Sequence, residues 1–390
     1  MSKTLAAILG GAAGAVALVG IVLVLWFCLF RNKSISRTSE SGSSDPSVQV
    51  GRNVGTELSL RGGVNFQYEA KRFALEELAV ATKNFSDINL IGNGKFGDVY
   101  KGLLQNGTIV AIKKRPGAPS QEFVVEVRYL SSIQHRNLVS LLGYCQENNQ
   151  QMLVYEYIPN GSVSSHLNGA SEIPGDKLEF KHRLPIALGA AKGLAHLHTM
   201  SPPLVHKNFK TANVLVDENF IAKVADAGIR NLLGKVDMAG TSSQVMTDHI
   251  FLAPEVREFG RFSERSDVYS FGVFLLELVS GREAMQSSES DQSLVEWVQN
   301  YQDWSHLSTI IDHKLGSSYT AEVMKEFIQL TAQCVDTSSQ RRPTMNHVVT
   351  ELDRILEKER SLTTIMGEGT PIFTLGSQLF TTTATTTSSR

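Results

Sequence analysis

The chain has 390 residues, of which 42% are hydrophobic and 19% are charged, and its formal net charge is −2. This length corresponds to roughly two or three domains or lobes at about 150 residues each, and such a chain can bury a core without disulfides or metals. The near-neutral charge argues against a nucleic-acid partner, and three widely spaced cysteines exclude a disulfide framework and a cysteine zinc site.

The N-terminal segment predicts a membrane anchor. Residues 5–30 form a run of 26 residues without a charge, and about 20 such residues span a bilayer as a helix. The alternative is a cleaved signal peptide, whose apolar core is usually only about 7–15 residues long. Basic residues are more numerous after the run than before it, so we expect a single-pass plasma-membrane protein with a cytoplasmic C-terminal part and no ectodomain. Gly10 and Gly14 are spaced so that two such helices could form a homodimer.

Composition divides the rest of the chain. Residues 31–72 are rich in Ser, Gly, Asn and Arg and predict a largely disordered juxtamembrane linker. From Phe73 to about residue 356, apolar residues recur at strand and helix spacings, which indicates an ordered domain. Residues 361–390 are dominated by Thr and Ser and predict a disordered tail.

A glycine-rich motif begins the ordered domain. Residues 91–97 read IGNGKFG, a GxGxxG pattern that dinucleotide-binding folds share. Such a fold would open a helix here, whereas the residues that follow, with Gly102 and Gly107, predict strand, turn and strand. Lys113 then ends the predicted strand 110–113, and Glu126 lies on a predicted helix over 123–133. A glycine-rich hairpin, a strand lysine and a helix glutamate in this order form the first half of a protein kinase signature.

The motifs downstream continue the series in the same order. They are FALEEL (73–78), ATKNFS (81–86), HRNLV (135–139), LVYEY (153–157), APE (253–255), SDVYSFG (266–272) and RP (342–343). Over about three quarters of its length the chain thus resembles the cytoplasmic kinase domain of plant receptor-like serine/threonine kinases. The resemblance implies an α+β bilobal fold after the transmembrane helix. We expect an antiparallel-sheet N-lobe up to about residue 155 and a mainly helical C-lobe from about 158 to 356.

The resemblance also assigns roles to individual residues. Lys113 would bind the α- and β-phosphates and pair with Glu126. Asp267 would support the catalytic loop, and Glu255 would pair with Arg342. Asn213 and Asp226 would bind Mg²⁺, and Asn208 and Lys210 would occupy the catalytic positions. The residues expected around ATP are Ile91, Gly92, Gly94, Gly97, Val99, Ala111, Lys113, Glu126, Glu156, Ile158 and Leu215.

Four departures from the family pattern surround the expected catalytic centre. Asn208 stands where the family has the aspartate that accepts the proton of the substrate hydroxyl. Ala227 replaces an aromatic ring that would stack between His206 and Leu130, a hole that Phe209 or Met238 could fill. Lys207 replaces an arginine, and it lacks the bidentate fork of that side chain. Before the APE motif the chain has Thr247-Asp248-His249-Ile250-Phe251, where the family usually has Gly-Thr-x-Gly-Tyr.

Two functions remain open from the sequence. We expect a membrane-anchored pseudokinase that binds ATP with Mg²⁺ and acts as a scaffold or allosteric partner of active receptor kinases. It could itself be phosphorylated at Thr241, Ser242, Ser243 or in the tail. The alternative is an active serine/threonine kinase with reduced or atypical catalysis, in which Asp248 could serve as a displaced base.

Overall fold

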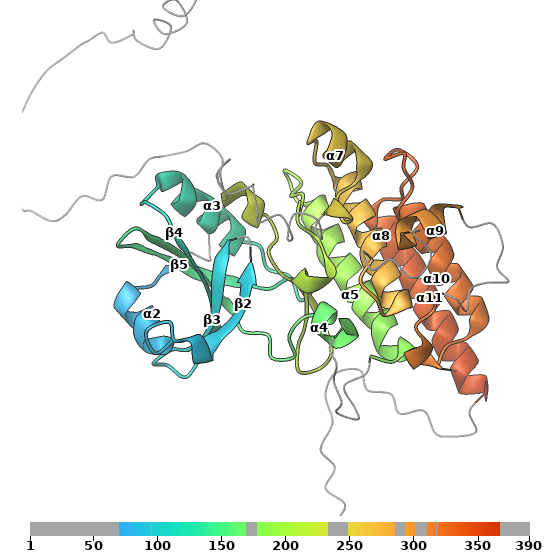
Figure 1. Cartoon of the computed structure of the whole chain (residues 1–390), viewed down its shortest axis with the longest axis horizontal. Helices are drawn as coiled ribbons and strands as arrows, with labels where there is room; N and C mark the ends of the chain where they lie inside the picture. Colours follow the sequence, from blue (N-terminus) through green and yellow to red (C-terminus); the bar gives the residue numbers. More distant parts are fainter. Residues whose placement is uncertain are drawn as a thin grey trace, which may run out of the picture. The chain divides into compact units, whose positions relative to one another are not determined.

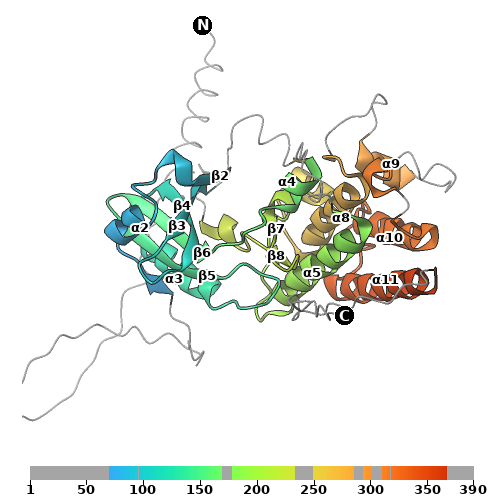
Figure 2. The same ribbon diagram turned by 90° about the horizontal axis from the view of Figure 1, so that it is seen from below.

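The computed structural model describes residues 70–94, 96–168, 178–232, 249–284, 293–300, 310–316 and 318–366. These residues form a sheet lobe followed by a helical lobe (Figures 1 and 2). The predicted membrane helix at 5–30 and nearly all of the predicted linker lie outside the described residues. Among the helices that are described, none combines the length and the apolar character needed to cross a bilayer.

The N-lobe contains a six-stranded mixed sheet. Its strands follow one another in the order β1 (Lys71–Arg72), β5 (Leu141–Glu147), β6 (Gln150–Glu156), β4 (Ile109–Pro116), β3 (Gly97–Leu103) and β2 (Leu90–Gly94). All neighbours are antiparallel except β1 and β5, which are parallel. The expectation of a purely antiparallel sheet is therefore wrong. A parallel pair needs a crossover connection, and here strands β2, β3 and β4 and two helices lie between β1 and β5 in the chain. The described part of the domain begins at residue 70, slightly before the predicted start at Phe73.

Two helices cover the two faces of this sheet. Because side chains alternate along a strand, Leu153 and Tyr155 join one hydrophobic cluster while Met152 and Val154 join another. Helix α3 (Gln121–Ser131) contributes to the first cluster, and α2 (Leu75–Ala81) contributes to the second. The helix predicted over 123–133 is α3, which begins and ends two residues earlier than expected. Helix α3 begins at a serine cap, since the Ser120 hydroxyl accepts a hydrogen bond from the Phe123 amide.

The C-lobe is built around two buried helices, α5 (Phe180–Thr199) and α8 (Glu264–Ser280). Every residue of α8 from Ser266 to Ser280 is buried, as expected of a helix that is covered on all sides. A capping box of Ser263 and Ser266 starts α8, and Gly281 ends it with φ of 62°. The other elements are η2 (Asp87–Asn89), α4 (Val163–Asn168), η3 (Thr211–Asn213), β7 (Val214–Val216), β8 (Ala222–Val224), η4 (Ile229–Leu232), α7 (Pro254–Phe259), α9 (Leu294–Asn300), η7 (His313–Leu315), α10 (Ala321–Cys334) and α11 (Met345–Met366).

The last helix extends beyond the predicted end of the domain. The predicted boundary near residue 356 and the start of a disordered tail at 361 are both wrong, because α11 continues to Met366. The reason is a contact with the start of α10: the Glu359 carboxylate is buried and accepts a hydrogen bond from the Thr320 amide at 3.1 Å. Residues 367–390 lie outside the described part of the chain.

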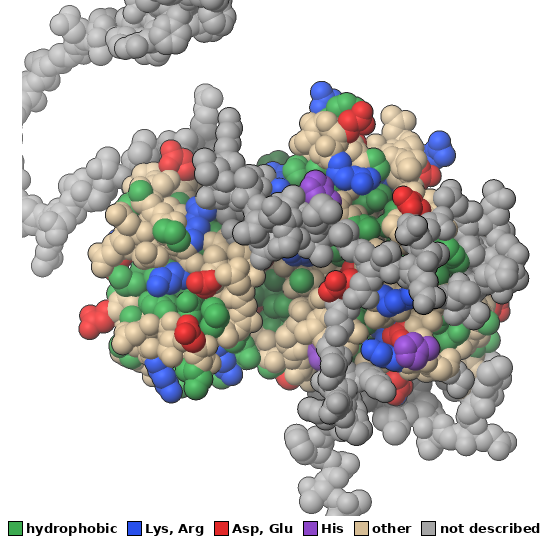
Figure 3. Space-filling model, in the orientation of Figure 1, with side chains coloured by type: hydrophobic (Ala, Val, Ile, Leu, Met, Phe, Trp, Pro, Cys, Tyr) green, Lys and Arg blue, Asp and Glu red, His purple; other side chains and the backbone are tan. Residues whose placement is uncertain are grey.

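A buried ion pair joins two distant parts of the C-lobe, as predicted. Arg342 donates to both carboxylate oxygens of Glu255, at 2.7 and 2.8 Å, and its own side chain is fully buried. Such bidentate pairs fix geometry as well as contributing energy. On the face shown in Figure 3, acidic and basic side chains are interspersed over the described surface of both lobes.

Candidate functional site

The catalytic-loop motif, residues 206–213, is held against helix α8 by hydrogen bonds to its backbone. The Asp267 carboxylate of α8 accepts hydrogen bonds from the amides of His206 at 2.7 Å and Lys207 at 3.0 Å. Lys207 has φ of 64°, a left-handed conformation that these two bonds help to hold. The predicted supporting role of Asp267 is confirmed by this geometry.

Two further contacts fix the end of this loop. The Asn213 side-chain amide donates to the carbonyl of Asn208 at 2.8 Å. The Thr211 hydroxyl donates to the buried carboxylate of Glu277, whose other oxygen accepts from the Ala284 amide. Burial raises the pKa of Glu277 to about 7, against the lowering effect of these two hydrogen bonds.

The His206 ring connects the loop to the segment that carries Asp226. Its Nδ1 accepts from the Asn208 amide at 3.3 Å, and its Nε2 lies 2.9 Å from the carbonyl of Ala225. This pattern fits a neutral ring with the proton on Nε2, and burial lowers the pKa of His206 accordingly. The Ala225 amide in turn donates to the Asn213 carbonyl at 2.8 Å. The two predicted metal-binding residues, Asn213 and Asp226, therefore lie on adjoining segments.

The Asn208 side chain is partly exposed and makes no hydrogen bond with the described residues. An amide offers one carbonyl acceptor but is not basic near neutral pH, so it cannot take a proton as the family aspartate does. Lys210, the second predicted catalytic residue, is partly buried two residues further along the loop.

The glycine-rich hairpin is formed by β2 and β3 as predicted. Gly97 has φ of 137°, and a Cβ at this position would overlap the carbonyl of Lys114, so only glycine fits here. Gly92 and Gly94 lie opposite Val99 and Gly97 in the strand register. No side chain crowds the space beside Gly92.

The residues expected to surround adenine are distributed over both lobes. Val99 and Ala111 alternate with the buried residues of β3 and β4, so they share one sheet face with Lys113. Leu215 is on β7 of the C-lobe, Ile158 is buried after β6, and Ile91 on β2 is 48% exposed. The Glu156 side chain accepts from the Ser140 amide at 2.8 Å and from Lys223 Nζ at 3.0 Å. These bonds hold the connection between the lobes.

Lys113 does not pair with Glu126. Its ammonium group forms an ion pair with the Asp226 carboxylate, with both side chains largely buried, and Asp226 has φ of 67°. Glu126 instead accepts from the side-chain amide of Asn231 at 2.9 Å. The predicted Lys113–Glu126 pair is therefore wrong for this structure. Lys113 lies closer to Asp226 than to Glu126, and Glu126 lies closer to Asn231 than to Lys113.

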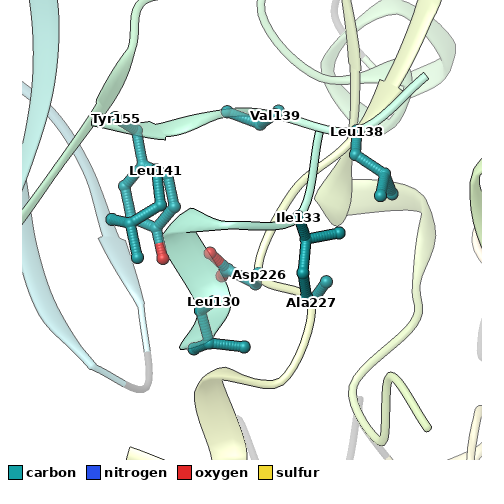
Figure 4. Close-up of a pocket in the computed structure, with 8 residues that line it drawn as sticks. All are labelled: Leu130, Ile133, Leu138, Val139, Leu141, Tyr155, Asp226 and Ala227. Carbon is teal, nitrogen blue, oxygen red and sulfur yellow. The ribbon is translucent and has the colours of Figure 1, made fainter. Parts of the chain in front are cut away.

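Ala227 and Tyr155 both line a small cavity. The cavity has a volume of about 20 Å³, room for about one water, and its lining is mostly apolar (Figure 4). Leu130 lines this cavity and also lies close to Gly228, where an added Cβ would come within 2.6 Å of Leu130 Cδ2. Phe209 is not the filler that the sequence suggested. Phe209 does not line this cavity, and its ring packs edge-on against His206 and Phe274 and at a tilt against Phe271 in the C-lobe. The other suggested filler, Met238, lies outside the described residues, as do Thr241, Thr247 and Asp248.

Sequence reasoning assigned no role to three residues that the structure brings to this site. Tyr155 is buried behind Lys113, whose Nζ lies 5.6 Å from the centre of its ring. Burial, followed by the charge of Asp226, raises the pKa of Tyr155 well above its ordinary value. Glu277 could have been noticed as a carboxylate within the otherwise apolar stretch 271–279 of α8. Asn231 carries no sequence signal, because its partners are distant in the chain.

Comparison with known proteins agrees with this geometry. The model of the protein tyrosine and serine/threonine kinase family matches residues 86–352. Probable serine/threonine-protein kinase PBL21 of Arabidopsis thaliana is 37% identical over 340 residues, which are 84% of this chain and 89% of that protein. Proline-rich receptor-like protein kinase PERK10 of Arabidopsis thaliana is 37% identical over 346 residues. These are 86% of this chain but 45% of that protein, so the chain spans less than half of its length.

Among solved structures, the pseudokinase domain of BIR2, an immune regulator of the RLK/Pelle family, is similar with a TM-score of 0.62 and 32% identity. The match covers 73% of this chain and 86% of that one. The family model spans more than half of the chain, and its ordered motifs build a two-lobed site around Lys113 and Asp226. The chain therefore belongs to the protein tyrosine and serine/threonine kinase family, among the plant receptor-like kinases.

Proposed function

We propose that this protein is a catalytically impaired receptor-like kinase, a pseudokinase that acts as a scaffold or allosteric partner of active receptor kinases. The observation that carries the proposal is Asn208 in a catalytic loop that is otherwise held as a kinase requires. Asp267, His206 and Asn213 keep the loop ordered, so the missing base does not result from a displaced loop. Loss of a general base typically costs about 10²–10⁴ in rate, from a kinase turnover of about 1–100 per second.

The proposal includes binding of ATP with Mg²⁺. Asn213 and Asp226 supply the hard oxygen ligands that Mg²⁺ prefers, and they lie on hydrogen-bonded segments. Lys113 and the glycine-rich hairpin would bind the phosphates, and ATP with its metal would supply the phosphoryl group and the neutralising charge. Because Lys113 is paired with Asp226, binding requires that this ion pair open or rearrange.

The proposal also includes attachment to a membrane. The uncharged run at 5–30, with more basic residues after it than before it, supports a single-pass anchor at the plasma membrane with the kinase domain in the cytoplasm. Receptor-like relatives such as PERK10 favour the same location. An anchored domain without strong transfer activity would act by holding an active receptor kinase, and homodimers through Gly10 and Gly14 are a second mode of assembly.

The test is phosphate transfer from labelled ATP by the purified full chain, with a generic protein substrate and a Lys113→Ala control. We expect transfer at least about 10²-fold below the ordinary kinase turnover of about 1–100 per second. Lys113-dependent transfer within that ordinary range would refute the impaired-kinase proposal. A wild-type signal that instead persists in the control would reveal a contaminating kinase.

A slow but active serine/threonine kinase is the second candidate. It is favoured by the retained phosphate and metal residues Lys113, Glu126, Asn213 and Asp226. The two candidates differ in the response to Asn208→Asp. A working but weakened enzyme should gain about 10²-fold or more in transfer when the base is restored. A domain that has lost more than its base should gain little.

A further inference from the structure

The short helix η4 makes hydrogen bonds to three elements that border the nucleotide site. Arg115 of β4 donates to the Leu232 carbonyl at 2.8 Å, and its guanidinium lies 4.7 Å from the ring centre of Phe96 in the glycine-rich hairpin. Arg230 donates to the Lys207 carbonyl in the catalytic loop at 3.1 Å. Because only Ala227 and Gly228 separate Asp226 from η4 in the chain, the position of η4 limits where the Asp226 segment can lie.

Asn231 provides a side-chain bridge within this arrangement. Its Nδ2 donates to Glu126 Oε1 of α3 at 2.9 Å, and its Oδ1 accepts from Lys207 Nζ of the catalytic loop at 2.7 Å. One amide thus uses its donor and its acceptor to connect the N-lobe helix with the C-lobe loop. An aspartate here would repel Glu126, and a lysine would repel Lys207, so the bridge specifically suits an uncharged amide.

We propose that Asn231 is a positioning residue that keeps the nucleotide site in a low-affinity arrangement by holding Glu126 away from Lys113. With Glu126 engaged by Asn231, Lys113 pairs with Asp226, and the phosphate-binding cation neutralises the carboxylate expected to bind the metal. Release of the bridge frees Glu126 to pair with Lys113, which leaves Asp226 available to Mg²⁺. The inference rests on the proposed binding of ATP with Mg²⁺.

The size of the effect follows from the number of bonds. The bridge consists of two hydrogen bonds at a solvent-exposed position, each modest in net strength. The apparent dissociation constant equals the intrinsic one divided by the fraction of molecules in the competent arrangement. We therefore expect Asn231→Ala to tighten ATP binding by about threefold to tenfold.

The test compares ATP affinity in the presence of Mg²⁺ by calorimetry on the full chain. The variants are wild type, Asn231→Ala, Glu126→Ala and the double variant. If Asn231 acts through Glu126, its replacement tightens binding in the wild-type background and has no effect once Glu126 is absent. Equal affinity of wild type and Asn231→Ala, or an equal gain in both backgrounds, would overturn the inference. Asn346→Ala, an exposed asparagine on α11, is the matched control and should bind as wild type does.

A second measurement does not depend on nucleotide. Amide hydrogen exchange of α3 should become faster in Asn231→Ala and in Asn231→Asp, which retains the bond to Lys207 but repels Glu126. Unchanged protection of α3 in both variants would overturn the inference. If wild type and every variant fail to bind ATP while α3 exchange does respond, the proposed nucleotide binding fails and the positioning role of Asn231 stands.

Discussion

Replacing Ala227 with phenylalanine restores the side chain that the family carries at this position, yet we expect it to destabilise the fold. The cavity beside Ala227 has a volume of about 20 Å³. Filling that volume would gain only about 0.5 kcal/mol at about 24 cal/mol per Å³. A phenyl ring has six carbons, and the cavity holds about one water, so Leu130 and Ile133 would have to move.

Overpacking of a filled site typically costs about 1–3 kcal/mol. The net expectation for Ala227→Phe is therefore a loss of about 1–2 kcal/mol, seen as a fall in Tm of about 2–5 °C. The assay is thermal and urea unfolding of the full chain without nucleotide. Ala212→Phe is the control, because Ala212 is exposed on the catalytic loop and a ring there meets no core. A rise in Tm for Ala227→Phe would refute the reasoning, since it would show that the space for the ring had been kept.

Three further changes test other parts of the structure. Burial raises the pKa of Glu277 from its ordinary value of 4.5 to about 7. The folded state therefore holds a proton that the unfolded state has lost, and about 3 kcal/mol of stability should disappear as the pH rises from about 4.5 to 7. Glu277→Gln should lack this contribution. The difference in unfolding free energy between variant and wild type, measured with urea, should therefore change between pH 5 and pH 8. A difference that stays constant over this range would contradict the raised pKa of Glu277. Arg342→Ala should cost about 3–5 kcal/mol in urea unfolding because it leaves Glu255 without its partner. Adding Glu255→Gln should recover part of that loss, and no recovery would argue against the ion pair. Asp267→Ala should lower the free energy of unfolding by about 2–6 kcal/mol, because two amides of the catalytic loop lose their acceptor. An unchanged free energy of unfolding would show that water or another group replaces the carboxylate.

The sequence alone predicted most of the fold, because the relevant signals are local. The glycine-rich hairpin, the strand with Lys113 and helix α3 follow from the spacing of glycines and apolar residues over a few positions. The buried Arg342–Glu255 pair and the support from Asp267 followed from motifs shared with the family. Asn208 and Ala227 are single substitutions within such motifs, so their chemistry is also visible in the sequence.

The errors have a common physical origin in contacts between distant segments. The parallel pairing of β1 with β5 depends on where the first strand meets a sheet edge formed some 70 residues later. The continuation of α11 to Met366 depends on a hydrogen bond between Glu359 and Thr320 of another helix. Neither contact leaves a periodic pattern in the sequence.

The partner of Lys113 is the clearest example of what only the tertiary structure decided. Glu126 and Asp226 are both carboxylates at family positions, and the sequence offers no means of choosing between them. The choice depends on the backbone of residues 226–232, which brings Asn231 within 2.9 Å of Glu126 across 105 residues of chain. Each such contact is worth only about 1 kcal/mol, so sequence patterns that specify the fold do not specify this arrangement. The sequence determined that the protein is a kinase relative without its usual base, and the packing around η4 determined which carboxylate neutralises the remaining lysine.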